Sequence, residues 1–226
     1  MKTIAIGDIH GNSSWKDIVS KGDFDKVIFI GDYFDSFHID GPTQVNNFRD
    51  IIEFKKNNLN KVILLIGNHD FHYLNVNERY SGFQEVMQFM LRTILEENLK
   101  YMQMCHVQDK ILFVHAGVTK TWCKNNKINL KNIEQSINDL FTYRPFAFKF
   151  TAGEERNSYG DETRQTPIWV RPRSLKMDMI KNYTQVVGHT MQDRLKLDNR
   201  IILIDCLGTS GEYLKIVDGE MSAVKN

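Results

Sequence analysis

Short apolar runs that end beside a glycine and an Asp, Asn or His most constrain the fold of this 226-residue chain. The first three runs, Lys2–Ile6, Lys26–Ile30 and Val62–Ile66, are rich in β-branched residues and nearly all apolar. Such runs are typical of strands that are buried on both faces of a parallel sheet. Amphipathic segments over Ser13–Ser20 and Thr43–Asn57 lie between them and predict helices. The alternation of strand and helix predicts an α/β fold.

After the third run the pattern is less regular. The spacing of apolar residues predicts a helix over Phe83–Leu99, with Val86, Phe89, Met90 and Ile94 on one face. Turn residues separate the strand-like runs that follow it. These further strands are predicted over Tyr101–Val107, Ile111–Val114, Gln185–Val187, Ile201–Ile204 and Tyr213–Val217.

The length of the chain favours one domain over residues 1–226. Within it, residues 119–173 are rich in Asn, Lys and aromatic side chains and have no clear period. We expect this segment to form a cap of helices and loops beside the functional site.

The net charge and the cysteine spacing bear on which partners and which compartment the protein has. A formal net charge of +1 gives no general attraction to nucleic acid or to an anionic membrane. The cysteines, Cys105, Cys123 and Cys206, lack CxxC spacing, which indicates reduced thiols. No run approaches the length of a membrane span, and the first residues lack the apolar stretch of a secretory signal. We therefore expect a cytoplasmic protein with no membrane partner.

Polar side chains that can bind metals follow five of the predicted strands. In an open α/β sheet the carboxyl ends of the strands meet at one crevice, where ligands bind. Carboxylate, amide and imidazole groups suit Mn, Fe, Zn or Mg better than a soft, thiol-seeking metal. The residues that follow the strands are Asp8 and His10, Asp32 and Asp35, Asn68, His69 and Asp70, His115, and His189.

The five motifs around these residues resemble those of the calcineurin-like metallophosphoesterase superfamily. Within it they are most similar to the phosphoprotein-phosphatase branch, including its bacterial and phage members. The resemblance implies a four-layer α/β/β/α sandwich, in which two sheets pack together between outer helices. The motifs are Gly7–Gly11, Gly31–Asp35, Gly67–Asp70, His115–Gly117 and Gly188–Thr190.

The resemblance also implies a role for each matching residue. Asp8, His10 and Asp32 would hold one metal ion. Asp32, Asn68, His115 and His189 would hold the second, so that Asp32 bridges the two. His69 would act as general acid or electrostatic stabiliser, and Asp35 would orient its imidazole. The ions are expected to be Mn²⁺, with Fe, Zn, Ni and Mg as alternatives.

This residue set suits in-line phosphoester hydrolysis. Two divalent ions about 3.5–4 Å apart can clamp the attacking and leaving oxygens, and a bridging hydroxide would attack phosphorus. The departing oxygen needs a proton, which an imidazole can supply near neutral pH. A carboxylate paired with His69 would raise the pKa of the imidazole and fix its tautomer.

One position departs from the branch. Ser36, followed by Phe37, stands where phosphoprotein phosphatases usually carry an arginine that binds phosphate oxygens in bidentate fashion. The segment Ile168–Arg171 resembles the Trp-x-Arg segment of bacterial members. We therefore predict Arg171 as a phosphate ligand, with Arg173 assisting, and Asn68 as a further substrate contact.

Three functions are compatible with these features. The leading one is hydrolysis of phosphomonoesters, as by a phosphoprotein Ser/Thr phosphatase. The missing arginine at Ser36 motivates the alternative, a nucleotide hydrolase acting on dinucleoside polyphosphates, cyclic phosphodiesters or nucleic-acid ends. A non-catalytic binding scaffold is the third, and the complete set of metal ligands argues against it. The sequence leaves open the physiological substrate, the native metal and the oligomeric state.

Residues outside the motifs have more ordinary interpretations. Aromatic side chains over 71–83 and 141–150 would stack a nucleobase or, more commonly, pack in the core. His38, His72 and His106 are expected on the surface or in the core, with His72 the best candidate for a further role because it lies close to His69.

Overall fold

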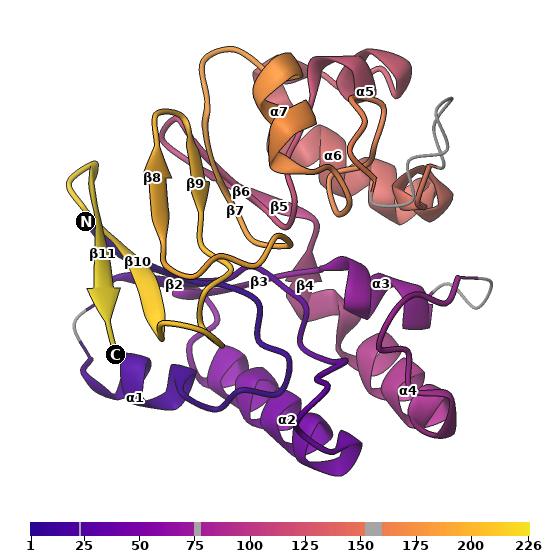
Figure 1. The fold of residues 1–226 in the computed structure, drawn as a ribbon, viewed down its shortest axis with the longest axis vertical. Coiled ribbons are helices and arrows are strands. Elements are labelled where there is room, and N and C mark those ends of the chain that lie inside the picture. The colour runs from indigo at the N-terminus through magenta and orange to yellow at the C-terminus, as the bar shows by residue number, and fades with distance from the viewer. Residues whose placement is uncertain (23, 75–77, 152–159) are drawn as a thin grey trace.

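Two β-sheets form the centre of the computed structural model, which describes residues 1–22, 24–74, 78–151 and 160–226. Helices lie on opposite sides of the pair, with α1 and α2 on one side and α5, α6 and α7 on the other (Figure 1). This arrangement confirms the predicted α/β/β/α sandwich.

The first sheet has the strand order β11-β10-β1-β2-β3-β4. Strands β1 to β4 run parallel, and β10 and β11 extend the sheet in antiparallel fashion from the edge of β1. The first three predicted strands therefore run parallel, as expected, and the structure places them side by side. The strands are β1 (Lys2–Ile6), β2 (Lys26–Phe29), β3 (Val62–Leu65), β4 (Met102–Gln103), β10 (Glu212–Val217) and β11 (Glu220–Lys225).

The second sheet has the order β5-β6-β7-β9-β8. Its three central strands, β6, β7 and β9, are parallel, so their carboxyl ends also share one edge. Its strands are β5 (Cys105–Gln108), β6 (Ile111–Val114), β7 (Thr184–Val187), β8 (Lys196–Asp198) and β9 (Ile201–Leu203).

The helices connect these strands. α2 begins where the side chain of Asp40 accepts a hydrogen bond from the Thr43 N–H at 2.9 Å, which caps the helix. Short 3-10 turns extend α4 and α6, over Glu85–Met87, Leu99–Tyr101, Leu130–Asn132 and Pro145–Phe148. The α-helices are α1 (Trp15–Ser20), α2 (Gly41–Asn57), α3 (Asn68–Leu74), α4 (Gln88–Asn98), α5 (Lys120–Asn125), α6 (Ile133–Tyr143) and α7 (Pro172–Asp178).

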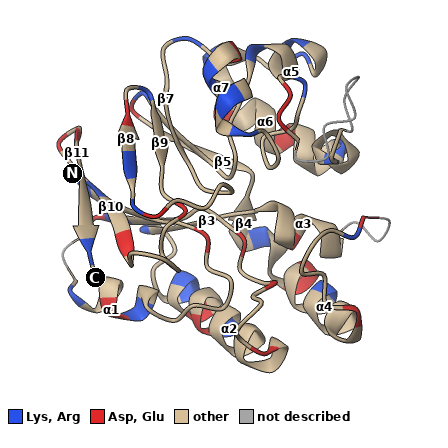
Figure 2. Ribbon diagram, viewed as in Figure 1, with Lys and Arg blue, Asp and Glu red and all other residues tan. Residues whose placement is uncertain are grey.

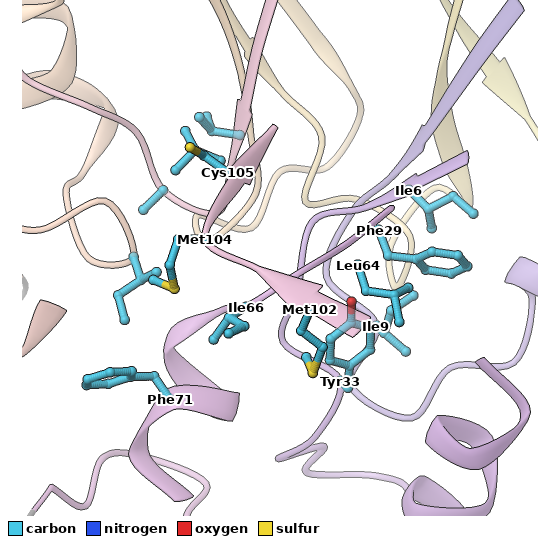
Figure 3. Packing of buried hydrophobic residues seen from close by; sticks show 14 of the residues in the cluster. Ile6, Ile9, Phe29, Tyr33, Leu64, Ile66, Phe71, Met102, Met104 and Cys105 are labelled. Atoms are coloured by element: carbon cyan, nitrogen blue, oxygen red, sulfur yellow. The ribbon is translucent and has the colours of Figure 1, made fainter. Parts of the chain in front are cut away.

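The apolar strands bury side chains on both faces because successive side chains point to opposite sides of a sheet. Ala5 and Ile28 lie in the apolar cluster that also contains Phe113 of the second sheet, so this cluster fills the space between the sheets. On the opposite face, Phe29 and Leu64 pack beneath the helices (Figure 3). Both layers fix the strand ends that carry the candidate site.

The predicted strand over Tyr101–Val107 is two strands in the structure. β4 belongs to the first sheet and β5 to the second, and Met104 lies at the crossing between them. The side chain of Asn138 accepts hydrogen bonds from the N–H groups of Met104, at 2.9 Å, and Cys105, at 3.2 Å. The Asn138 side chain thus supplies a hydrogen-bond acceptor where the backbone leaves one sheet and enters the other. The apolar pattern of the sequence does not indicate this contact.

The apolar face predicted for the helix after Phe83 enters the core only at Ile94. Val86 is 98%, Phe89 83% and Met90 46% exposed, whereas Ile94 is buried together with Leu91 and Leu95. The buried stripe of α4 is therefore rotated from the predicted face, and α4 packs against α3. Strands β8 and β11 were not expected, since their residues are mostly exposed and polar.

Charged residues of both signs are spread over the fold (Figure 2). Cys105, Cys123 and Cys206 are free and buried, in agreement with the cysteine spacing. Within the described ranges, the helices are too short or too polar to traverse a lipid bilayer.

Candidate active site

The carboxyl ends of β1, β2, β3, β6 and β7 bring the predicted ligands together. Besides the group Asp35, His69 and His72, two groups of side chains among the described residues have potential ligand atoms that all lie within 4.8 Å of one another. One group is Asp8, His10 and Asp32, and the other is Asp32, His115 and His189. Asp32 belongs to both, which matches the bridging position expected from the resemblance.

Local hydrogen bonds select the ring nitrogen that each histidine offers. Nδ1 of His10 lies 2.5 Å from the Phe34 carbonyl, and Nδ1 of His115 lies 3.1 Å from the Ile30 carbonyl. A carbonyl can only accept, so both Nδ1 atoms carry the proton. Their Nε2 atoms are then left as lone-pair donors, at 3.8 Å and 3.3 Å from Oδ2 of Asp32.

His189 uses the opposite nitrogen. Its Nε2 lies 3.1 Å from the Trp169 carbonyl, so the proton is on Nε2 and Nδ1 faces the centre of the site. Oδ1 of Asn68 lies 2.8 Å from this Nδ1 and 2.9 Å from Nε2 of His115. An amide oxygen and two imidazole nitrogens thus converge beside Asp32.

The backbone is strained where it presents these groups. His10, Asp32 and His189 all have positive φ values, of 42°, 52° and 63°, in a region that L-residues rarely adopt. Glycine is required at two neighbouring positions. A Cβ on Gly67 would lie 2.1 Å from Oδ1 of Asp32, and one on Gly188 would lie 2.0 Å from Oδ1 of Asp8.

The burial and mutual repulsion of the Asp8 and Asp32 carboxylates favour a bound cation. Burial, together with repulsion from Asp205 and Asp32, raises the pKa of Asp8 well above its ordinary value. Burial acts on Asp32 in the same direction, but the imidazoles of His115 and His69 outweigh it and hold the pKa of Asp32 well below the usual range. Two buried, mutually repelling carboxylates with imidazole nitrogens beside them form a ligand set that suits a divalent ion.

Asp70 supports the Asp32 loop from behind. Its Oδ2 accepts hydrogen bonds from the N–H groups of Asp32 and Gly67, each at 2.9 Å, and its Oδ1 accepts one from the Tyr33 N–H at 2.8 Å. The N–H of His69 in turn donates to Oδ1 of Asp32 at 2.9 Å. The aspartate therefore holds the loop in the conformation that presents Asp32.

His69 lies at the edge of the ligand cluster and pairs with Asp35. Its Nδ1 is 2.9 Å from Oδ2 of Asp35, and its ring packs edge-on against His10 with a centroid separation of 5.2 Å. Burial alone would lower the pKa of His69, but the carboxylates of Asp32 and Asp35 outweigh it and raise that pKa above its ordinary value. The imidazole can therefore carry a proton near neutral pH.

Arg171 reaches the cluster, whereas Arg173 does not. Nη1 of Arg171 donates to the carbonyl of His189 at 3.0 Å and to Oγ1 of Thr190 at 3.2 Å. Arg173 is exposed near the start of α7, and within the described part of the chain it has no hydrogen bond or ion pair to a site residue. Ser36 stands where the usual arginine would be, and its Oγ accepts from the N–H groups of His38 and Ile39, each at 3.2 Å.

A pocket of about 470 Å³ opens beside the cluster. Its lining includes His10 and His69 together with Ser36, Phe37 and Met191. Phe37 and Met191 are each 74% exposed, which is unusual for large apolar side chains. The pocket therefore offers an apolar surface directly next to the candidate general acid.

Three residues near the site were not predicted from the sequence to belong to it. Tyr73 and Gln84 contact Asp35, and Asp205 lines the pocket beside Asp8. Asp205 follows the predicted strand Ile201–Ile204, so the rule that located the other ligands would also have found it. Burial and repulsion by Asp32 raise the pKa of Asp205 to about 6.

The other two histidines outside the motifs lie as expected. His38 is exposed at the pocket, and His106 is buried with its Nδ1 2.9 Å from Oε1 of Glu134. Most of the aromatic side chains pack in the core, with Tyr143 and Phe146 exposed.

Comparison with known proteins agrees with this geometry. Residues 1–192 match the family model of the calcineurin-like phosphoesterases. A symmetrical bis(5'-nucleosyl)-tetraphosphatase from Methylobacillus flagellatus is 28% identical over 149 residues, which cover 61% of this chain and 51% of that protein. The chain thus spans about half the length of the curated relative it matches.

Solved structures share the fold. A cold-active protein-tyrosine phosphatase from Shewanella is 21% identical, with a TM-score of 0.66 over 98% of this chain and 77% of that one. A protein serine/threonine phosphatase from Saccharomyces cerevisiae is 11% identical, with a TM-score of 0.63 over 100% of this chain and 80% of that one. At such low identity the two likenesses show the fold alone.

Proposed function

Since this chain belongs to the calcineurin-like phosphoesterase family and is a metal-dependent phosphoester hydrolase, we propose that it hydrolyses phosphomonoesters, with phosphorylated Ser and Thr side chains as the leading substrates. The observation that carries the proposal is Arg171, whose guanidinium is bonded to the loop of the candidate ligand His189. A cation fixed there would bind the dianionic phosphoryl group of a monoester.

The residues proposed to hold two divalent ions, most simply Mn²⁺, form the two groups that share Asp32. When bound, the ions would activate water and offset charge on the phosphoryl oxygens. Asp8 and His10 complete one proposed site, and Asn68, His115 and His189 complete the other. The tautomers fixed by backbone carbonyls support this assignment, because each imidazole presents a lone pair to the cluster.

The remaining chemistry is assigned to His69 and Arg171. Protonated His69, held by Asp35 through Nδ1, would donate its Nε2 proton to the departing alkoxide or aryloxide oxygen. Arg171 would orient the phosphoryl group, and Asn68 would contribute a further polar contact. Residues 119–173 are proposed as a cap beside the site, supported by the contacts of Trp169 and Arg171 with His189; part of this segment, 152–159, lies outside the described residues.

Turnover of p-nitrophenyl phosphate and bis-p-nitrophenyl phosphate by the Mn²⁺-loaded protein tests the proposal. We expect the monoester to be hydrolysed faster, and phosphoserine peptides to be substrates as well. A diester rate far above the monoester rate would overturn it. Absence of hydrolysis of both compounds, with metal bound, would instead favour a binding scaffold.

The pocket beside His69 favours a second candidate, hydrolysis of dinucleoside polyphosphates. Exposed Phe37 and Met191 could stack a nucleobase of a leaving group at this position. The relative from Methylobacillus flagellatus carries the name of such an activity. Diadenosine tetraphosphate, with nucleotide products separated by chromatography, tests this candidate, and a kcat/KM far above that for phosphoserine peptides would establish it.

A further inference from the structure

We propose that His72 is a positioning residue for the reaction, because it shares the carboxylate of Asp35 with His69. This inference rests on the proposed function, in which His69 is the general acid. It concerns a buried imidazole beside Asp35 that belongs neither to the predicted metal ligands nor to the proton donor.

The geometry places two imidazoles on one oxygen. Oδ2 of Asp35 lies 2.9 Å from Nδ1 of His69 and 2.7 Å from Nε2 of His72. The approach of His72 is not aligned as an ideal hydrogen bond, so we describe it as a close electrostatic contact. His72 follows His69 by three residues in α3, and this spacing puts both rings on the same side of the helix.

The other oxygen of Asp35 is held as well. Oδ1 accepts a hydrogen bond from the Tyr73 hydroxyl at 2.5 Å and another from Nε2 of Gln84 at 3.1 Å. Four groups therefore surround one carboxylate whose side chain is fully buried. Such a carboxylate cannot rotate freely, and His69, which is bonded to it, keeps one ring orientation.

Packing fixes His72 in turn. Its side chain has no exposed surface. Its ring lies edge-on to Phe83, with a centroid separation of 4.9 Å, and parallel to Tyr80, with a centroid separation of 6.1 Å. Within the described residues, neither ring nitrogen of His72 forms a regular hydrogen bond, but Nε2 lies 2.7 Å from Oδ2 of Asp35 whereas no such contact is found for Nδ1. A proton there would be a buried, unpaired donor, so the ring is neutral and carries its proton on Nε2, facing Asp35.

A neutral donor at this position has a specific consequence. It adds partial positive charge beside Oδ2 without adding a full charge that would compete with protonation of His69. Without His72, Asp35 would lose one of the groups that fix Oδ2, and His69 would point less reliably at the departing oxygen. The loss would affect proton donation and leave substrate binding unchanged.

The test compares two leaving groups. p-Nitrophenolate departs as a stable anion, whereas phenolate needs a proton, so phenyl phosphate depends on the general acid far more strongly. His72→Phe keeps a ring among the neighbouring aromatic side chains and removes the donor. We expect kcat for phenyl phosphate to fall about tenfold, which is the lower end of the range for the loss of a contact that supports a site residue. The kcat for p-nitrophenyl phosphate should stay within about twofold of the wild type, and KM should be unchanged for both substrates.

A conservative variant and a matched control separate positioning from stability. His72→Gln places an amide donor near the original Nε2 and should restore most of the phenyl phosphate rate. His106→Phe removes another buried imidazole that pairs with a carboxylate, that of Glu134, away from the site. It should lower the melting temperature and leave the ratio of the two rates unchanged.

The outcomes are distinct. A His72→Phe protein with the wild-type ratio of rates would overturn the inference, and so would a His72→Gln protein as impaired as His72→Phe. An equal change of ratio in His106→Phe would show a general effect of destabilisation and would also overturn it. If the wild-type protein loaded with Mn²⁺ hydrolyses neither aryl phosphate, the proposed function itself fails.

Discussion

The backbone N–H of His189 donates to both carboxylate oxygens of Asp8, at 3.2 Å to Oδ1 and 3.0 Å to Oδ2, across 181 residues of sequence. Asp8 follows β1 of the first sheet, and His189 follows β7 of the second. The contact therefore joins the two sheets at the edge where the candidate ligands converge. It forms only because Gly188 has no side chain between the strand end and the carboxylate.

Gly188→Ala should therefore disable the site while the fold survives. The new Cβ would lie 2.0 Å from Oδ1 of Asp8, so the carboxylate or the His189 loop must move. We expect Mn²⁺ affinity to fall at least about tenfold, as when supporting contacts of a metal site are lost. Overpacking should reduce the free energy of unfolding by about 1–3 kcal/mol.

Isothermal titration with Mn²⁺ and thermal melting measure both effects. Gly219→Ala is the control, since nothing lies within 4 Å of a Cβ at this β10–β11 turn although φ is +91°. It should cost about 1 kcal/mol of stability through backbone strain and leave Mn²⁺ affinity unchanged. Tight Mn²⁺ binding by Gly188→Ala would contradict the close approach of the two segments.

His69→Ala should separate catalysis from metal binding. The N–H that holds Asp32 belongs to the backbone of His69 and survives the substitution. We expect about two bound Mn²⁺ ions as in the wild type and a kcat about 10²- to 10⁴-fold lower, the usual range for a general acid. Metal analysis after gel filtration and steady-state kinetics measure the two quantities.

Asp32→Ala is the complementary variant, because Asp32 belongs to both ligand groups. It should bind neither ion tightly. If His69→Ala also loses its metal, His69 is a ligand and its assignment as proton donor is wrong.

The features that can be predicted from this sequence are those that depend on short local segments of the chain. Asp8, Asp32 and His115 each follow an apolar strand within two residues, so local pattern and parallel pairing together locate them. The same logic predicted that β1, β2 and β3 are strands of a parallel sheet. These features depend on short segments whose geometry is nearly the same in every parallel sheet.

Features that depend on tertiary contacts could not be predicted in this way. Gln84 is 49 residues from Asp35 in the sequence, and no sequence motif indicates the hydrogen bond between them. The buried face of α4 is set by its packing on α3, and apolar Val86 and Phe89 remain exposed against the pattern. The division of Tyr101–Val107 between two sheets depends on the side chain of Asn138.

Arg171→Ala tests the proposed phosphate contact. A hydrogen bond to a charged group is worth about 1.5–3 kcal/mol, so we expect kcat/KM for phosphomonoesters to fall about 10- to 100-fold. Arg171→Lys should recover only part of this, because a single ammonium cannot bind two oxygens in parallel. Steady-state kinetics with p-nitrophenyl phosphate provide the measurement.

Arg173→Ala is the matched control, two residues further along the chain and exposed. It should stay within about twofold of the wild type, as expected for a surface charge at this position. If Arg173→Ala loses as much activity as Arg171→Ala, the assignment of the phosphate ligand to Arg171 alone is wrong.

Glu134 should make stability depend on pH at a place remote from the metals. Its Oε1 lies 2.9 Å from Nδ1 of His106, and its Oε2 accepts from the Val107 N–H at 2.9 Å. Burial alone would raise the pKa of Glu134, but these contacts outweigh it and hold that pKa below the ordinary value of 4.5. Between the folded and unfolded pKa values, the unfolded chain binds more protons, so the contribution of Glu134 is complete above about pH 4.5 and is lost as pH falls through the folded pKa.

Urea unfolding of the metal-free protein between pH 3 and pH 7 measures this contribution. Glu134→Gln should lower the free energy of unfolding by about 1 kcal/mol at pH 7, a modest figure because the carboxylate is partly exposed to solvent. The difference from the wild type should shrink as the pH falls below about 4.5. Asp50→Asn, which removes an exposed pair with Lys16, serves as the control and should change stability by less than about 0.5 kcal/mol. A difference between Glu134→Gln and the wild type that stays constant down to pH 3 would mean that the carboxylate is not held ionised by His106 and Val107.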